Sequence, residues 1–191
     1  MSTEKKRAVG LVILTCIPGQ NEAGEDTGEK KLAAVLQRRG EHNFADKDGR
    51  RESFRGMCQV SCHGKLDDTD MTFTQALYRE MKEELGKSFL WALLDVYAGN
   101  LGQAIVELSH LNEKDKEVIT YGLLVEAFLL KFVQFHCDSG GFRLLFEDEE
   151  ILPVDFKAHK HAGVPDWQKT YMFADEIAAV QAAFKHFKQQ V

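Results

Sequence analysis

Three glutamates stand close together in the middle of the chain, where Glu80, Glu83 and Glu84 are spaced i, i+3 and i+4. At about 3.6 residues per turn, these positions fall within an arc of roughly 100° on one face of a helix. Like charges at this spacing oppose helix formation by roughly 0.2–0.5 kcal/mol per pair, and a bound cation would reverse that cost. Hard carboxylate oxygens suit Mg²⁺ or Mn²⁺, which also bind substrate phosphates. The spacing therefore predicts a divalent metal site.

A helix over residues 72 to 85 is expected to hold these carboxylates in place. Leu77, Met81 and Leu85 follow at i, i+4 and i+8, so one side of the helix can be buried. Gly86 supplies a residue that readily ends a helix. The alternative interpretation is a solvated acidic face without a metal, balanced by Lys82 and Lys87.

Strands are predicted before this helix. The apolar, β-branched run 8 to 17 indicates a buried strand, and 32 to 38 indicates a second, with the polar, Gly-rich stretch 18 to 31 as a loop between them. A polar segment over 40 to 56 leads to a short strand over 57 to 61. Lys5, Lys6 and Arg7 precede the first run, as in a signal peptide, but Pro18-Gly19 closes it as a turn would.

Further elements are predicted after the helix. They are a helix over 88 to 98 stopped at Gly99-Asn100, strands over 104 to 111, 118 to 125 and 142 to 146, and a final helix over 175 to 188. The segment 128 to 136 fits either a helix or a strand. This order predicts an α/β (α+β) fold, with a central mixed sheet between helices.

The stretch from Gly64 to Gly86 resembles the Nudix box, G-x5-E-x7-R-E-U-x-E-E-x-G-U with U aliphatic. The run Arg79-Glu80-Met81-Lys82-Glu83-Glu84-Leu85-Gly86 matches its second half. Three features depart from the pattern: the spacing from Gly64 to Arg79 is one residue longer, Asp70 is the nearest substitute for the first glutamate, and Lys87 replaces the final aliphatic residue. The resemblance implies a single Nudix-type α/β/α sandwich domain over residues 1 to 191.

The resemblance also implies a site and a reaction. Glu80, Glu83 and Glu84 with the Gly64 carbonyl would bind Mg²⁺ (or Mn²⁺), and Arg79 would orient a carboxylate by ion pairing. Arg79, Glu83 and Glu84 are the catalytic candidates. The implied activity is hydrolysis of a diphosphate linkage in a nucleoside-diphosphate-X substrate.

Two roles are less sharply placed. Arg38, Arg39 and Arg55 flank the expected site, and their guanidinium groups suit contact with substrate phosphates. Relatives place an additional catalytic glutamate on different elements, which leaves Glu117 or the acidic cluster 147 to 150 as the candidates for a general base.

Two other functions stay open. The segments around Arg38 and Phe54 and the run 60 to 64 also resemble isopentenyl diphosphate isomerase, in which Cys62 and Glu117 would form an acid/base pair. A Nudix module that binds a nucleotide without cleaving it is the third hypothesis. The complete carboxylate set favours hydrolysis, and Cys62 also fits an ordinary buried position.

Composition limits the partners. The 191 residues carry 24 Lys and Arg against 30 Asp and Glu, which argues against a general nucleic-acid binder or a binder of anionic membranes. Four scattered cysteines form neither a disulfide framework nor a zinc motif, so a cytoplasmic location is expected. The expected partner is a small phosphorylated molecule, a nucleotide derivative, and relatives with this motif are often homodimers.

Overall fold

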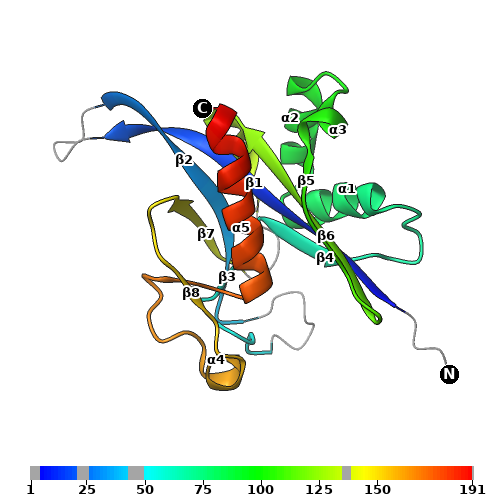
Figure 1. The fold of residues 1–191 in the computed structure, drawn as a ribbon, viewed down its shortest axis with the longest axis vertical. Coiled ribbons are helices and arrows are strands. Elements are labelled where there is room, and N and C mark those ends of the chain that lie inside the picture. Colours follow the sequence, from blue (N-terminus) through cyan, green and yellow to red (C-terminus); the bar gives the residue numbers. More distant parts are fainter. Residues whose placement is uncertain (1–4, 21–25, 43–49, 135–138, 191) are drawn as a thin grey trace.

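A mixed β-sheet forms the centre of the computed structural model, which describes residues 5–20, 26–42, 50–134 and 139–190 (Figure 1). Strand β1 (Lys6–Gln20) lies between β2 (Asp26–Arg39), to which it is antiparallel, and β6 (Lys116–Val125), to which it is parallel. The sheet has seven strands in the order β3-β2-β1-β6-β5, with β4 paired to β1 and β7 to β2. The remaining four are β3 (Cys58–Gln59), β4 (Cys62–Lys65), β5 (Val106–Asn112) and β7 (Ser139–Phe146).

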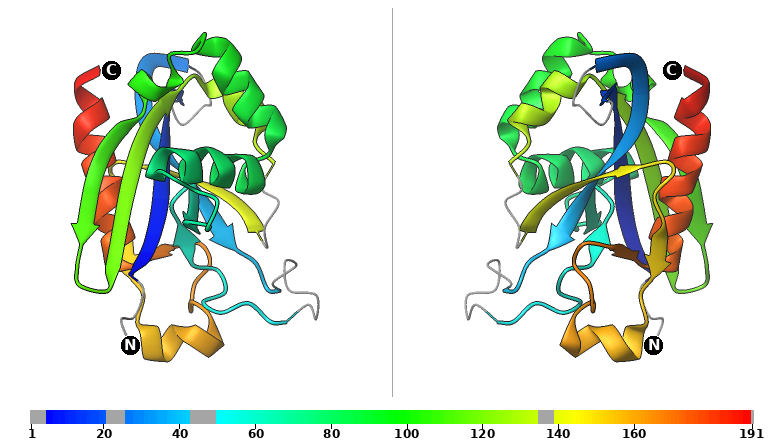
Figure 2. Two further views of the ribbon diagram at one scale, coloured as in Figure 1. Left: turned by 90° about the vertical axis from the view of Figure 1, so that its right-hand side faces the viewer. Right: turned by 90° about the vertical axis from the view of Figure 1, so that its left-hand side faces the viewer.

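Helices cover both faces of this sheet (Figure 2). One face carries α1 (Phe73–Glu84), α2 (Lys87–Val96), the short α3 (Leu101–Ala104) and the 3-10 helix η1 (Ala127–Phe132). The other carries α5 (Ala174–Phe187), followed by the 3-10 helix η2 (Lys188–Gln190). The expected α/β/α arrangement with a central mixed sheet is confirmed.

Successive side chains of β1 point to opposite faces of the sheet, so this strand contributes to two hydrophobic cores. Val9 and Leu11 point to the α1 face, whereas Val12 and Leu14 point to the α5 face, and all four are fully buried. A strand covered on both faces needs apolar residues at consecutive positions. This is why the run 8 to 17 lacks a polar alternation.

Helix α1 forms where the sequence predicts it. The Thr72 hydroxyl accepts a hydrogen bond from the Gln75 backbone N–H at 3.1 Å, which caps the first turn. Leu77 and Met81 are buried against β1, and the adjacent face of the helix, which meets β4, carries Glu80 and Glu84. Gly86, with φ of +92°, ends α1 and begins the turn into α2.

Two predictions about strands before α1 are wrong in detail. The expected loop 18 to 31 is largely strand, because β1 runs to Gln20 and β2 begins at Asp26. Its residues from Asp26 to Lys31 are exposed, so backbone pairing such as Ile17 with Lys31 forms the ribbon without a hydrophobic signal. The expected strand 57 to 61 is instead β3, two connecting residues and β4, which pair with different strands.

The segment that joins β7 to α5 in the sequence forms a peripheral layer that was not predicted. It contains β8 (Ile151–Pro153), α4 (Phe156–Ala162) and β9 (Thr170–Met172), and its core includes Phe54, Met57 and Tyr171. These elements are too short to show a periodic pattern. The open segment 128 to 136 is 3-10 helix through Phe132, and its residues 135 and 136 lie outside the described ones. Within the described chain, none of the helices has both the length and the apolar character to cross a membrane.

Candidate active site

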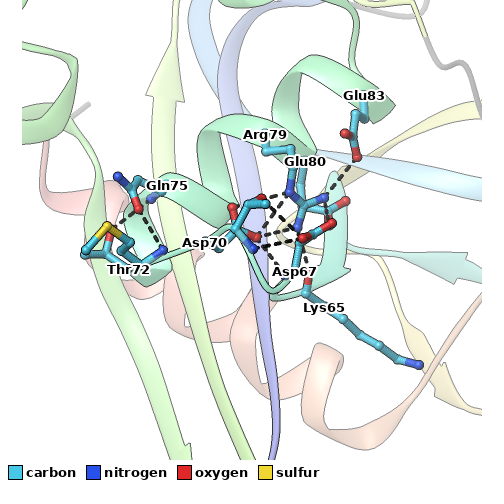
Figure 3. Close-up of polar contacts among 10 residues, drawn as sticks. Lys65, Asp67, Asp70, Thr72, Gln75, Arg79, Glu80 and Glu83 are labelled. Carbon is cyan, nitrogen blue, oxygen red and sulfur yellow. Dashed lines mark hydrogen bonds and ion pairs between the residues drawn. The ribbon is translucent and has the colours of Figure 1, made fainter.

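Arg79 is the centre of the polar cluster on α1 (Figure 3). Its guanidinium donates to Glu80 Oε1 at 2.8 Å, to Glu83 Oε2 at 3.0 Å and to Asp70 Oδ2 at 2.7 Å. The Lys65 carbonyl accepts a further bond at 2.7 Å. One cation therefore orders three carboxylates from two segments and ties α1 to the end of β4, which agrees with the ion-pairing role expected for Arg79.

Asp70 takes part in this cluster from the loop before α1. Both of its oxygens accept from the Arg79 guanidinium, and this bond lowers the pKa of the carboxyl group. The nearest substitute for the missing first glutamate of the motif is thus an ion-pair partner of Arg79. The loop with one additional residue still brings a carboxylate to the arginine.

Glu80 packs directly against the backbone of Gly64 in β4. A Cβ atom added at Gly64 would lie 1.8 Å from the Glu80 carboxylate carbon, so another side chain at this position would displace the glutamate. Glu80 is 7% exposed, and this burial raises its pKa, opposed by the bond from Arg79. The glycine of the motif thus makes room for the first helix carboxylate.

Glu84 contacts the same strand one residue earlier. Its Oε2 accepts a hydrogen bond from the His63 backbone N–H at 2.9 Å. Burial raises the pKa of Glu84 to about 7, and the nearby charge of Glu80 adds to the shift, while Arg39 opposes it. Burial therefore disfavours the ionised forms of Glu80 and Glu84, which Arg79 opposes at Glu80 and the His63 N–H opposes at Glu84.

The carboxylates of α1 are not arranged as a set of metal ligands in the structure. Among the described residues, no group of three His, Cys, Asp or Glu side chains is arranged to hold a metal ion. Arg79 contacts Glu80 and Glu83, so these two oxygens face the guanidinium. The donor chemistry nevertheless fits a hard cation, because two of the carboxylates have raised pKa values and the Gly64 backbone lies against one of them.

The three arginines expected to bind substrate differ in their surroundings. Arg39 lies near Glu84 and pairs with the buried Glu52. Arg38 lies at the preceding position of β2 and pairs in register with Cys58. Arg55 is buried and donates to the Ala162 carbonyl at 2.7 Å, which connects it to the end of α4. This structural contact was not foreseen, and a role for each arginine in substrate binding stays a prediction.

Cys62 and Glu117 do not lie together. The thiol is fully buried in the core beneath α1, and burial raises its pKa well above its usual value. Glu117 is level with Arg7 in the β1–β6 register, whereas Cys62 is level with Leu11, four residues further along β1. Glu117 instead pairs with Arg7 and His110. The geometry does not support an acid/base pair between these two residues.

The acidic cluster 147 to 150 is also engaged elsewhere. Glu147 pairs with Lys188 of η2, and Glu149 pairs with Arg143 at 3.0 Å and accepts from the Phe146 N–H. Phe146 pairs with Ala33, six residues before Arg39 on β2. Neither glutamate contacts the Arg79 cluster in the structure, and the identity of a general base stays a prediction.

Sequence reasoning missed two features near the site. Glu176, in the first turn of α5, lies close enough to Arg39 for that charge to affect the pKa of Glu176.

The second feature is a groove of about 430 Å³ that borders Asp70 and is lined by Arg7, Lys65 and Asp67 among others. A larger groove of about 900 Å³ lies at the start of β2, near Lys30 and Lys188, away from the carboxylates. Only packing in three dimensions reveals these neighbours.

Comparison with known proteins gave matches among solved structures alone. No family model and no curated protein matches the chain. A mutT/nudix family protein from Listeria innocua is 14% identical with a TM-score of 0.58, covering 98% of this chain and 97% of that one. The NUDIX domain of Shewanella oneidensis NrtR is 13% identical (TM-score 0.49; 96% and 88% covered), and a C. elegans Ap4A hydrolase is 15% identical (TM-score 0.47; 97% and 99% covered).

The similarity to the Listeria protein extends over nearly the whole of both chains, and it includes the central mixed sheet with helices on both faces. The Gly64–Glu80 contact and the Arg79 cluster lie where β4 meets α1. The protein therefore has the fold of the Nudix superfamily.

Proposed function

We propose that the protein is a metal-dependent hydrolase that cleaves a diphosphate linkage in a nucleoside-diphosphate-X substrate. The observation that carries this proposal is the packing of Glu80 against Gly64, with Arg79 bridging Glu80, Glu83 and Asp70. Burial still raises the pKa values of Glu80 and Glu84 in this arrangement, so their ionised forms carry a structural cost. A cation would offset that cost.

Glu80, Glu83, Glu84 and the Gly64 carbonyl would hold Mg²⁺ (or Mn²⁺). The metal would neutralise charge on the diphosphate and help to generate the attacking hydroxide. The chain itself supplies positioning: Arg79 fixes the carboxylates, and the His63 N–H fixes Glu84. The basic side chains of Arg7 and Lys65 beside Asp70 would attract a phosphorylated substrate into the adjoining groove.

The proposal is tested with Glu84→Gln. A neutral amide is a poor ligand for a hard cation, so turnover should fall by more than the roughly 10–100-fold typical of changes around a metal's ligands. Glu83→Gln should act likewise, and the double variant should lose far less than the product of the two effects. Assays should cover nucleotide sugars, dinucleotides, nucleoside triphosphates and isopentenyl diphosphate, with Mg²⁺ or Mn²⁺.

Glu113→Gln, on the exposed β5–β6 turn, is the matched control. Without metal, Glu84→Gln should melt at the same temperature as the wild type or slightly higher, because a partly buried charge has been removed. Added Mg²⁺ should stabilise the wild type more than the variant. Near wild-type turnover of Glu84→Gln at saturating Mg²⁺ would show that the carboxylates do not act through a metal.

A further inference from the structure

Among the described residues, four buried side-chain atoms have no hydrogen-bond partner: Arg38 Nε, Arg143 Nε, Thr170 Oγ1 and Glu176 Oε2. Leaving a buried polar atom unpaired is unfavourable, and native proteins contain few such atoms. These four come from β2, β7, β9 and α5, which are distant in sequence. Their location in one part of the fold therefore calls for an explanation.

Cys58 is the residue that connects three of them. It pairs in register with Arg38 across β2 and β3, and its thiol is hydrogen-bonded to the Arg38 side chain. The charges of Arg143 and Glu176 also act on the pKa of this thiol, which burial raises. Cys58 belongs to the core beneath α5. These three side chains therefore lie near Cys58, on the α5 side of the sheet.

Arg38 and Arg143 project from the same face. Arg143 pairs with Leu36, two residues before Arg38 on β2, and Leu36 belongs to the same core as Cys58. Side chains of paired strand residues share a face, and diagonal neighbours lie roughly 7–8 Å apart at the backbone. Arg38 and Arg143 are therefore diagonal neighbours on one face of the sheet, and Arg143 also pairs with Glu149.

The structure holds Arg143 by its two terminal nitrogens. Nη1 donates to the Gln168 carbonyl at 2.7 Å, and Nη2 donates to Glu149 at 3.0 Å, which leaves Nε as the donor without a partner. Thr170 follows Gln168 by two residues and lies on the same face of β9 as Met172, which packs in the Cys58 core. Thr170 is 1% exposed, so its hydroxyl also faces the interior.

We propose that Arg38, Arg143 and Thr170 form a binding site for a phosphate group of the substrate, separate from the carboxylates of α1. Two charged donors and a hydroxyl match the acceptor oxygens of a phosphate, and arginine is well suited to this contact. The Arg143 side chain is 20% exposed. The charge of Arg39, the next residue of β2, lowers the pKa of Glu84.

Assignment of this phosphate to the substrate rests on the proposed function, but its binding can be measured without catalysis. Inorganic phosphate is titrated into the full chain in EDTA by calorimetry, with the Arg Nε–H signals followed by NMR. The wild type should bind saturably, and the Arg38 and Arg143 Nε–H signals should shift. Arg143→Gln should weaken binding at least about tenfold, as expected for loss of a charge-assisted hydrogen bond. Arg51→Gln, whose side chain is 66% exposed, is the control and should bind like the wild type.

Thr170→Val tests whether the Thr170 hydroxyl contacts the ligand or only supports the fold. It also provides a test of the site if Arg143→Gln fails to fold. Because the hydroxyl is unpaired in the free protein, valine should leave the melting temperature unchanged or raise it, while phosphate binding weakens severalfold. A lower melting temperature with unchanged phosphate affinity would overturn the proposal. Absence of saturable phosphate binding by the wild type would overturn it as well.

Kinetics then test the link to substrate. With the best hydrolysed nucleotide, Thr170→Val should raise KM and leave kcat near the wild-type value, because the contact lies away from the reacting atoms. Inorganic phosphate should compete with the nucleotide, and its inhibition constant should weaken in Thr170→Val in proportion to its dissociation constant. An unchanged KM and inhibition constant would overturn the assignment to substrate. Failure of the proposed hydrolysis itself would show separately, as no turnover by a wild type that still binds phosphate.

Discussion

At the scale of single residues, Gly64 and Glu80 depend on each other. The glutamate carboxylate fills the volume that a Cβ atom at Gly64 would need, and it is then held by Arg79. Burial in this position raises the pKa of Glu80, whereas the bond from Arg79 lowers it. The absence of a side chain at one residue thus sets the position and the charge balance of another on a different element.

Gly64→Ala tests this dependence. We expect loss of most Mg²⁺-dependent turnover and a smaller stabilisation by Mg²⁺, because the Glu80 carboxylate must leave its position. Activity and Mg²⁺-dependent melting temperature are the measurements. Gly102→Ala is the control, since nothing lies within 4 Å of a Cβ atom there, and it should keep wild-type activity. Equal activity of the two variants would contradict the contact.

At the scale of elements, the sheet forks where β2 and β4 leave β1. β1 pairs with β4 as far as Leu11 and with β2 from Ile13 onwards. Ser61 fills the fork: its hydroxyl accepts from the Ile13 N–H at 2.7 Å and donates to the Val35 carbonyl. One hydroxyl thus satisfies two backbone groups that the diverging strands leave behind, and it positions β4 for its contacts with α1.

Ser61→Ala removes a single oxygen atom, but it should lower the stability of the protein substantially. A buried N–H and a buried C=O lose their partner, which predicts a loss of about 1–3 kcal/mol in the free energy of unfolding and a melting temperature lower by about 2–4 °C per kcal/mol. Faster hydrogen exchange at the Ile13 amide is expected as well. Ser88→Ala, at an exposed position of α2, should change neither. Similar melting of both variants would argue against the role of the fork.

At the scale of the whole molecule, α5 closes one face of the sheet and brings a carboxyl group into its interior. Val180, Ala183 and Phe184 pack against the β1–β2 core, while Glu176 lies near β3, where the Val60 N–H donates to it at 3.4 Å. Burial raises the pKa of Glu176 to about 7, and Asp175 adds to the shift. Packing of α5 against the sheet therefore favours the protonated form of Glu176.

The sign of this coupling gives a pH-dependent prediction. Below about pH 4.5, Glu176 is protonated in both states and has no effect; from there to about pH 7, the unfolded state ionises first and stability falls. Glu176→Gln should match the wild type in acid and exceed it by about 1–3 kcal/mol above pH 7. Urea unfolding in EDTA at several pH values measures the difference, and the exposed Glu113→Gln should show none. If the free energies of unfolding of the wild type and Glu176→Gln differ by the same amount at every pH, this prediction is wrong.

The sequence alone determined the main elements and the face that carries the acids. Apolar runs specify β1 and the core of β2, and the spacing of Leu77, Met81 and the glutamates specifies α1, because these signals arise from residues close in the chain. The exposed end of the β1–β2 ribbon and the short elements β8, α4 and β9 carry no such periodicity, so their formation depends on pairing and packing with distant segments.

The tertiary structure decided which side chains meet. Asp70 reaches Arg79 because the loop before α1 folds back on the helix, and Cys62 is buried because β4 inserts beside β1 beneath α1. Arg38 and Arg143 share a face because β2 pairs with β7 across more than a hundred residues of sequence, and the bond from Arg143 to the Gln168 carbonyl brings the segment of Thr170 to them. Pairing of that kind follows from chain topology, whereas local sequence fixes only each residue's own element and face.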